Sequence, residues 1–298
     1  MRLLDWGLLI LLSLIWGGSF YFVEVALREV TPLVVVWARV GMAALGLLAL
    51  LSLLNIPIVR DLKVWRAFFV MGVLNNVFPY SLIAWGQTEI SSSLASIFNA
   101  TTPLFTIVLA QFLTADEKIN GLKITGLILG FCGVVLMVGL EALEGLSGAV
   151  LAQCAILGAA ISYGCAAIWG RRFKTLHPMM STCGQVVCST IVMTPLALIY
   201  GFPTGYFLPS VHVISALVLL AMACTALAYI LYFKILSTSG ATNLMLVTFL
   251  IPLSAISLGF FFLGERLSLD QIAGMGLILL GLLVIDGRIM TYRFSFSR

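Results

Sequence analysis

Long apolar runs, separated by short polar connections, follow one another along almost the whole chain. Each run is about 20 residues long, which is the length of helix that crosses a hydrocarbon core about 30 Å thick. Charged residues, Pro and Gly mark where the runs end. The pattern predicts ten membrane-spanning helices, over residues 5–24, 32–54, 64–86, 91–113, 120–140, 147–169, 179–201, 211–234, 241–263 and 269–288.

The composition agrees with this all-helical membrane protein. Apolar residues make up 61% of the 298 residues and charged residues only 9%, whereas about a quarter of the residues of a soluble domain are charged. So few charges cannot cover a water-facing surface, and no polar stretch is long enough to fold as a separate soluble domain. We therefore expect the lipid bilayer and a small molecule as partners, and no nucleic acid.

The positions of Lys and Arg test the ten-helix topology, because both collect in cytoplasmic connections. An even number of helices places both termini on one side. If that side is the cytoplasm, the inner segments hold thirteen of the sixteen Lys and Arg residues, the outer segments hold Arg28 and Arg266, and Arg39 lies within a helix. The sequence thus predicts a multi-pass protein of the bacterial inner membrane with cytoplasmic N- and C-termini.

Residues 99–137 and 249–285 repeat each other. The matched residues are Pro103 with Pro252, Glu117 with Glu265, Gly126 with Gly274 and Gly133 with Gly281, at offsets of 149 and then 148 residues. Each half contains five predicted helices, so the second half must cross the membrane in the opposite sense. We expect two inverted-topology repeats, residues 1–142 and 143–298, around a central cavity. Such repeats are typical of secondary transporters, which bind substrate between the halves.

The repeated order of apolar helix, proline, acidic loop and Gly-rich closing helix resembles the EamA domain of the drug/metabolite transporter superfamily. The WGGSF sequence at Trp16 to Phe20 resembles its first-helix motif. The likeness covers essentially the whole chain, although Ala115-Asp116-Glu117 stands where the family usually has Leu-Gly-Glu. Length and duplication are similar to those of bacterial exporters in this superfamily. The resemblance implies export of small organic metabolites by alternating access, with amino acids, including aromatic ones, as expected substrates.

Polar side chains within the predicted helices indicate where a cavity lies, because they are costly in lipid. Ser92, Ser96, Asn99, Thr102 and Thr106 recur at three- and four-residue intervals and form one stripe on the fourth helix. The stripe is typical of a cavity wall, and hydrogen bonding between helices is the alternative.

Three prolines, Pro79, Pro103 and Pro252, lie within predicted helices. Each removes a backbone hydrogen bond from the carbonyl four residues earlier and so predicts a kink. Kinks in both halves suit a pair of rocking elements, although they could also serve packing alone.

Aromatic residues and one Arg complete the candidate site. Trp16, Tyr80, Tyr163 and Tyr229 lie near the middle of their helices, where they could stack on a flat substrate or simply pack. Arg39 is the only basic residue well inside a helix, and it could attract a carboxylate or extend to the membrane surface. The candidate substrate-binding residues are Trp16, Ser19, Arg39, Asn75, Asn76, Tyr80, Ser96, Asn99, Tyr163, Gln185, Tyr229 and Asn243.

Other functions have weaker support. No nucleophile, base or metal cluster lies at membrane depth, so we expect no enzyme, no metal and no cofactor. A channel would show charged rings or a repeated filter motif, and an exporter of drugs or organic cations would need a buried carboxylate. The absence of mid-depth Asp and Glu also favours a facilitator over a proton antiporter. Gly126 and Gly130 favour close packing within the fold, compatible with a monomer, and leave the oligomeric state open.

Overall fold

The computed structural model describes residues 3–139, 147–202 and 208–286, excepting the side chains of residues 241 and 242. Within these ranges the elements are helices joined by short loops. Nine helical segments of the described chain are long and apolar enough to cross a membrane, and Val247–Leu263 is a shorter apolar tenth. The predicted all-helical membrane fold is confirmed. The expected boundary between residues 142 and 143 lies outside the described residues.

The helices of the two halves differ in how often they are interrupted. The first half contains α1 (Leu3–Leu27), α2 (Pro32–Leu53), α3 (Leu62–Gly72), η1 (Val73–Val77), α4 (Phe78–Gly86), α5 (Ser92–Asn99), α6 (Thr102–Leu113) and α7 (Gly121–Val138). The second contains α9 (Gly148–Gly170), η2 (Arg171–Phe173), α10 (Pro178–Leu196), η3 (Ala197–Gly201), α11 (Val211–Ala221), η4 (Met222–Leu227), α12 (Ala228–Leu244), α13 (Val247–Leu258), η5 (Gly259–Leu263) and α14 (Leu269–Asp286). Four of these elements, η1, η3, η4 and η5, are π-helical turns, a form often found at functional sites.

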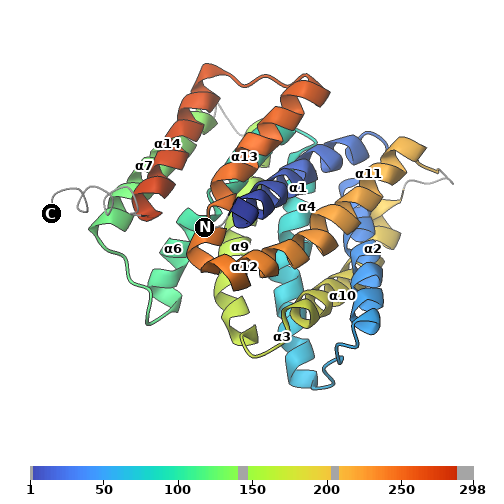
Figure 1. Ribbon diagram of the computed structural model, residues 1–298. Coiled ribbons are helices and arrows are strands. Elements are labelled where there is room, and N and C mark those ends of the chain that lie inside the picture. The colour runs from blue at the N-terminus through green and yellow to red at the C-terminus, as the bar shows by residue number, and fades with distance from the viewer. Residues whose placement is uncertain (1–2, 140–146, 203–207, 287–298) are drawn as a thin grey trace.

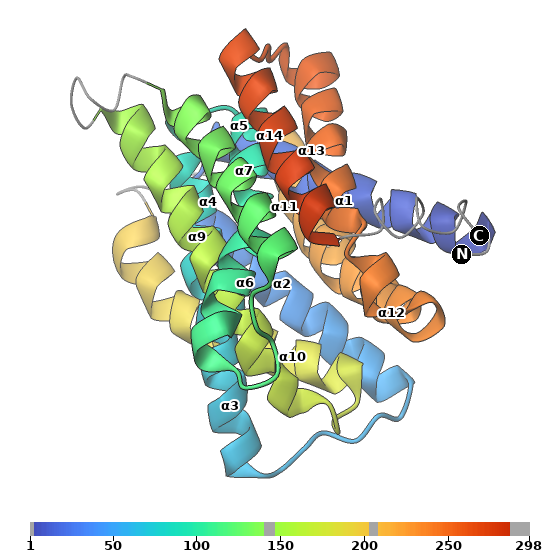
Figure 2. The same ribbon diagram turned by 90° about the vertical axis from the view of Figure 1, so that its left-hand side faces the viewer.

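The two halves pack on each other with an approximate twofold relation. Helix α1 packs against α13, and its equivalent α9 packs against α6, the equivalent of α13. In the same way, α4 packs against α9, and α11 and α12 pack against α1. The equivalent pairs α2 with α10 and α7 with α14 lie side by side, the latter pair at one edge of the molecule (Figures 1 and 2). Each half therefore buries its apolar faces against the other half.

Glycines bring α7 and α14 into backbone contact. A Cβ on Gly281 would lie 2.5 Å from the carbonyl oxygen of Gly126, and one on Gly133 would lie 2.5 Å from that of Gly274. The sequence repeat matches Gly126 with Gly274 and Gly133 with Gly281. Gly126 therefore contacts Gly281, which is the counterpart of Gly133, and Gly133 contacts Gly274, which is the counterpart of Gly126. A twofold axis between α7 and α14 requires this crossed pairing.

The three expected kink prolines occupy different backbone settings. Pro79 lies in the first turn of α4, directly after the π-helical turn η1. Pro103 lies in the first turn of α6, after α5 has ended at Asn99, so the fourth segment is broken into two helices. Pro252 lies inside α13. The carbonyl of Asn99 left without its usual partner accepts a hydrogen bond from Thr102 Oγ1 at 2.7 Å.

The break between the predicted eighth and ninth helices lies later than expected. The predicted eighth helix ends at residue 234, but helical structure continues through α12 to Leu244, with an interruption at Gly240. Gly240 has φ +77°, a conformation that glycine adopts without a Cβ penalty. The apolar pattern missed this continuation because residues 237–243 are polar or small.

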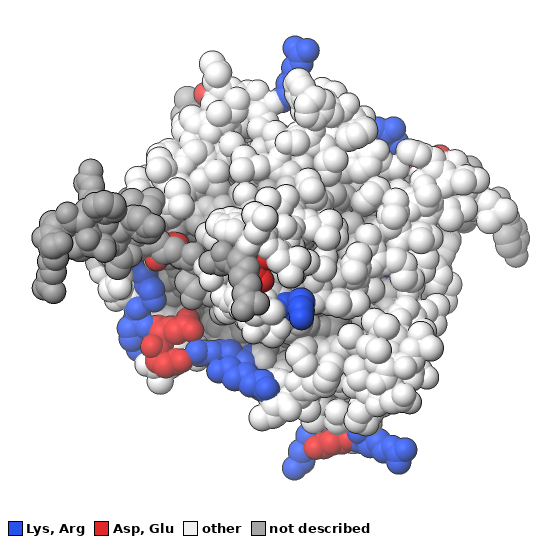
Figure 3. All heavy atoms as spheres, viewed as in Figure 1, with Lys and Arg blue, Asp and Glu red and all other residues white. Residues whose placement is uncertain are grey.

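Basic residues concentrate on one side of the helix bundle. The loops that follow α2, α6 and α9 carry Lys and Arg, whereas the loops that follow α1 and η5 carry only Arg28 and Arg266. Figure 3 shows Lys and Arg mainly along the lower part of the visible surface, with uncharged residues over most of the remainder. We call these two ends of the bundle the basic side and the opposite side.

Candidate functional site

A cavity of about 680 Å³ lies between the two halves and is the candidate substrate site. Its walls come from helices of both halves, including α1, α4 and α5 of the first and α9, α10 and α12 of the second. A volume of this size is in the range of small-molecule sites. Nine predicted residues line it: Trp16, Ser19, Arg39, Asn75, Tyr80, Asn99, Tyr163, Gln185 and Tyr229.

The other three predicted site residues do not line the cavity. Asn76 follows Asn75 on the helix and so points to a different face, where its Nδ2 donates to Ser189 Oγ at 2.9 Å. Ser96 is fully buried and its hydroxyl donates to the Ser93 carbonyl at 2.7 Å. Asn243 Nδ2 donates to the Ser239 carbonyl at 2.8 Å, near the end of α12. For these residues the sequence indicated polarity correctly but not the direction of the side chain.

Besides Thr102 of the predicted polar stripe, five polar or charged lining residues were absent from the sequence-based set: Gln87, Lys174, Ser181, Tyr232 and Thr248. Two of them carried a usable signal. Thr248 lies 149 residues after Asn99 and is therefore its counterpart in the repeat. Tyr232 follows Tyr229 by three residues, which places both on one helical face.

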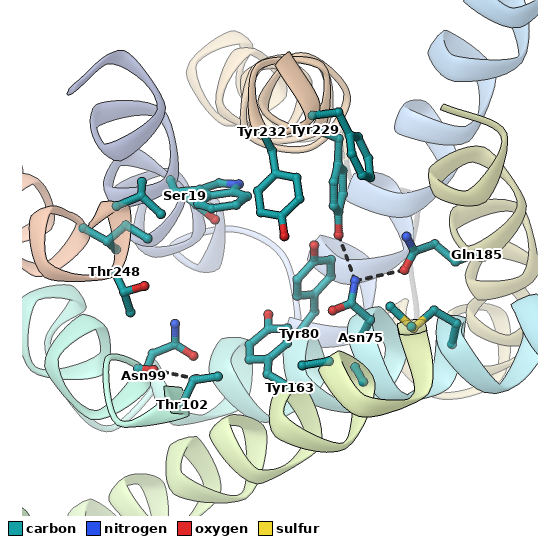
Figure 4. Close-up of a pocket in the computed structure, with 18 of the residues that line it drawn as sticks. Ser19, Asn75, Tyr80, Asn99, Thr102, Tyr163, Gln185, Tyr229, Tyr232 and Thr248 are labelled. Carbon is teal, nitrogen blue, oxygen red and sulfur yellow. Dashed lines mark hydrogen bonds between the residues drawn. The ribbon is translucent and has the colours of Figure 1, made fainter. Parts of the chain in front are cut away.

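Asn75 forms hydrogen bonds to two other polar side chains on one wall of the cavity. Its Nδ2 donates to Gln185 Oε1 at 2.9 Å and to the Tyr229 hydroxyl at 2.8 Å (Figure 4). Asn75 lies in the π-helical turn η1, whereas the partners come from α10 and α12 of the other half. Because both partners use an acceptor in these bonds, the Gln185 amide hydrogens and the Tyr229 hydroxyl hydrogen remain available to donate to a ligand.

Arg39 supplies a positive charge to the same cavity. Its side chain is only 7% exposed; Nε donates to Thr225 Oγ1 at 3.0 Å, and Cζ lies 3.8 Å from the centre of the Tyr80 ring. The ion pairs among the described residues involve Arg171, and none involves Arg39. Burying a cation without an anion costs several kcal/mol. The site is therefore best completed by a negatively charged ligand.

A second polar group lies across the cavity from Asn75. Ser19, Asn99, Thr102 and Thr248 lie together on this wall (Figure 4). The Asn99 Oδ1 atom is buried and has no hydrogen-bond partner within the described structure. An unpaired buried acceptor is costly, so a ligand that donates a hydrogen bond would stabilise this wall.

Aromatic rings form the wall between these polar groups. Trp16 from α1 and Tyr232 from α12 have ring centroids 5.8 Å apart, and Tyr80 and Tyr163 lie across the space from Tyr232 (Figure 4). Such rings supply apolar surface together with hydroxyl donors. A ligand with an apolar or flat portion fits between them.

The charges around the cavity are positive. Arg39 and Lys174 line it, and no Asp or Glu is among its lining residues in the described parts of the chain. The cavity can thus neutralise a carboxylate but offers no fixed negative charge to a cation. No group of three or more His, Cys, Asp or Glu residues within the described ranges could hold a metal ion.

The cavity opens on the basic side and is closed on the opposite side. Lys174 and Pro178, which line it near the loop after α9, are exposed. At the other end the lining residues Gln87 and Phe20 are only 3% and 6% exposed. A solute therefore reaches the Arg39 region from the basic side in this conformation.

The model of the EamA-like transporter family matches residues 6–139 and again residues 150–286, one match in each half. The chain belongs to the EamA-like transporter family. Membership makes it a membrane transporter and explains the duplicated, interleaved architecture.

EamA-type relatives match nearly the full length of the chain. The uncharacterized transporter YoaV of Bacillus subtilis (strain 168) is 22% identical over 292 residues, covering 97% of each chain. Protein PecM of Dickeya dadantii (strain 3937) is 26% identical over 276 residues, covering 91% of this chain and 89% of PecM. A solved crystal structure shares the fold with a TM-score of 0.68 at 15% identity, covering 95% of this chain and 98% of that one.

Alanine substitutions at Asn99 and Ser96 distinguish the face of α5 that lines the cavity from the face that packs against other helices. We expect the Asn99→Ala variant of this EamA protein to insert normally but to lose about tenfold in transport, because one hydrogen bond to the solute is worth about 1 kcal/mol or somewhat more. Ser96→Ala, one turn earlier, is the matched control, since Ser96 bonds only to its own helix. Transport rates of both variants, normalised to protein in the membrane, test this. Equal losses in both would contradict the assignment of the cavity face.

Proposed function

We propose that this EamA-family protein exports amino acids, preferentially those with apolar or aromatic side chains, across the bacterial inner membrane. The observation that carries the proposal is Arg39, a buried cation that has no anionic partner, and no Asp or Glu beside it in the cavity lining, among the residues that the structure describes. A carboxylate is the simplest group that completes such a site, because guanidinium and carboxylate match in charge and geometry. The aromatic walls favour a substrate with an apolar portion.

The surrounding groups suit the remaining parts of an amino acid. Tyr229 and Gln185, oriented by Asn75, have hydrogens free to donate to the carboxylate. The apolar side chain would lie between the Trp16 and Tyr232 rings. The unpaired Asn99 Oδ1 provides an acceptor that an ammonium group could use. Each portion of a zwitterion thus has a complementary group on the cavity wall.

Export, as the direction of transport, rests on the likeness to bacterial exporters of this superfamily, and the placement of the cavity mouth agrees with it. The mouth lies on the side rich in Lys and Arg, which the positive-inside rule assigns to the cytoplasm together with both termini. Substrate would then bind from the cytoplasm and be released outside after the halves change their relative position. Among the described residues no carboxylate lines the cavity to carry a proton, and we propose that the substrate gradient alone drives transport.

Export of organic cations is the second candidate, because aromatic rings also attract cations. Tyr80 already stacks on the Arg39 guanidinium, and the described lining of the cavity provides no carboxylate to balance a second positive charge. The charge of the cavity therefore favours the amino acid.

A pair of closely similar solutes tests the choice between these candidates. L-phenylalanine and its methyl ester share the ring and the ammonium group, but the ester lacks the carboxylate and carries a net positive charge. We expect unlabelled phenylalanine to inhibit uptake of labelled phenylalanine into proteoliposomes at least about tenfold more strongly than the ester does, since one charge-assisted contact is worth about 1.5–3 kcal/mol. Stronger inhibition by the ester would favour the cation exporter.

A further inference from the structure

A carboxylate holds the closed end of the cavity. Glu265 Oε1 accepts hydrogen bonds from the Ser92 backbone nitrogen and hydroxyl, both at 2.9 Å. Its Oε2 accepts from the Ser93 backbone nitrogen at 3.0 Å and from the Ser93 hydroxyl. Glu265 belongs to the second half and α5 to the first, so these four bonds join the halves on the opposite side, away from the cavity mouth.

The local backbone is built for this contact. The π-helical turn η5 ends at Leu263 and is followed by Gly264, whose φ of +69° reverses the chain. The Glu265 nitrogen donates to the Gly259 carbonyl at 3.0 Å. A Cβ on Gly259 would overlap both the Glu265 carboxylate and the Ser93 hydroxyl. Only glycine at position 259 lets the carboxylate reach α5 in this way.

A second contact closes the same end. Gln87, at the end of α4, donates from Nε2 to the Phe20 carbonyl at 2.9 Å and to Glu24 Oε2 at 3.3 Å. This links α4 to α1 beside the Glu265 contact. In the described structure polar contacts between a few helix ends thus join the elements at the closed end.

The repeat places an equivalent carboxylate, Glu117, on the basic side, where the cavity is open. Glu117 is 51% exposed, and its carboxylate pairs with Arg171 at 3.1 Å. At the offsets of 148 to 149 residues, Ser92 and Ser93 correspond to residues 240–242, the start of the helical segment that follows the break at Gly240. The first residues after Gly240 therefore correspond to the first turn of α5. Glu117 corresponds to Glu265, which binds that turn of α5.

We propose that Glu265 and Glu117 are reciprocal gate residues of the transport cycle. In the present conformation Glu265 holds the first turn of α5 and keeps the opposite side closed. When that side opens, Glu265 releases α5, and Glu117 leaves Arg171 to bind the backbone N–H groups after Gly240, which closes the basic side. The proposal rests on the transport function and not on the identity of the solute.

Helix electrostatics explain why carboxylates suit this role. The first N–H groups of a helix lack partners within the helix and form a partial positive charge, so a carboxylate is stabilised there. Because each half supplies one such contact, each of the two conformations has one engaged carboxylate and one released. Two conformations of similar free energy are what alternating access requires.

Sided labelling of a cysteine introduced at a buried cavity residue measures the closed end. Val23 lines the cavity near that end and is buried. A Val23→Cys variant is treated with a membrane-impermeant maleimide in right-side-out and in inside-out vesicles, with the parent protein giving the background from the native cysteines. We expect Glu265→Gln to raise labelling from the opposite side at least about fivefold, the lower end of typical conformational coupling. Glu117→Gln should lower that labelling below the level of the Val23→Cys variant that keeps both Glu265 and Glu117.

Asp116 provides the matched control. It precedes Glu117 and also pairs with Arg171, at 2.9 Å between Oδ1 and Nη1, but it corresponds to Gly264 and not to Glu265 in the repeat. Asp116→Asn should therefore leave Val23→Cys labelling unchanged. The proposal is overturned if Glu265→Gln leaves Val23→Cys protected, if both Glu variants change labelling in the same direction, or if Asp116→Asn acts like Glu117→Gln. Because labelling needs no substrate, these outcomes are independent of whether amino acids are transported.

Discussion

The Arg39→Leu variant is expected to lose transport of phenylalanine by about hundredfold or more. The change removes the positive charge that the described residues bury among the aromatic walls, and the loss of one partner of a buried charge pair costs about 2–5 kcal/mol. The protein itself should remain folded, because replacing a buried, unpaired cation with an apolar residue is often neutral or stabilising. Initial rates in proteoliposomes, together with the melting temperature of the purified protein, measure both effects.

Two further variants serve as controls for the Arg39→Leu experiment. Arg39→Lys keeps the charge but loses the planar geometry of the guanidinium, so it should restore part of the transport lost in Arg39→Leu. Lys174→Ala removes a charge from the exposed mouth and should have a much smaller effect, because water screens it. Unchanged phenylalanine transport by Arg39→Leu would contradict the carboxylate site.

The second large effect is expected for stability, from Gly281→Val. The added side chain would meet the Gly126 carbonyl at 2.5 Å and the Gly130 nitrogen at 2.7 Å, both backbone atoms that cannot move aside. Overpacking typically costs about 1–3 kcal/mol, and forcing two backbones apart should exceed that range. We expect little monodisperse protein after detergent extraction, as measured by size-exclusion chromatography.

Gly276 provides the control for this substitution. It lies on the same helix, but a Cβ there would meet nothing within 4 Å. Gly276→Ala should therefore be extracted as well as the unsubstituted protein. A folded and stable Gly281→Val variant would show that α7 and α14 do not need their backbone contact.

The topology could be predicted from the sequence because the bilayer imposes a strong and simple pattern. Ten apolar runs and the asymmetry of Lys and Arg required no knowledge of packing. The boundary after residue 234 was misplaced because α12 continues through polar residues, which a hydropathy pattern cannot distinguish from a loop. For the same reason the sequence predicted one fourth helix with a kink at Pro103. In the structure this segment is two helices, because α5 ends at Asn99 and α6 begins at Thr102.

The cavity could be predicted less completely, because a site depends on the rotation of each helix. Asn75 and Asn76 are identical in chemistry and adjacent in sequence, yet only Asn75 lines the cavity. The π-helical turn η1, which sets their directions, has no recognisable sequence pattern. Glu265 was assigned to a loop, and its four bonds to α5 became apparent only from the structure.

Counterflow of phenylalanine in proteoliposomes, with no ion gradient imposed, shows whether the protein carries an amino acid without a coupling ion. The purified protein is reconstituted in liposomes preloaded with unlabelled phenylalanine, and labelled phenylalanine is added outside. We expect transient accumulation of label that disappears in the Arg39→Leu variant. The absence of exchange both without a gradient and after a pH step, in vesicles that contain folded protein, would contradict this expectation.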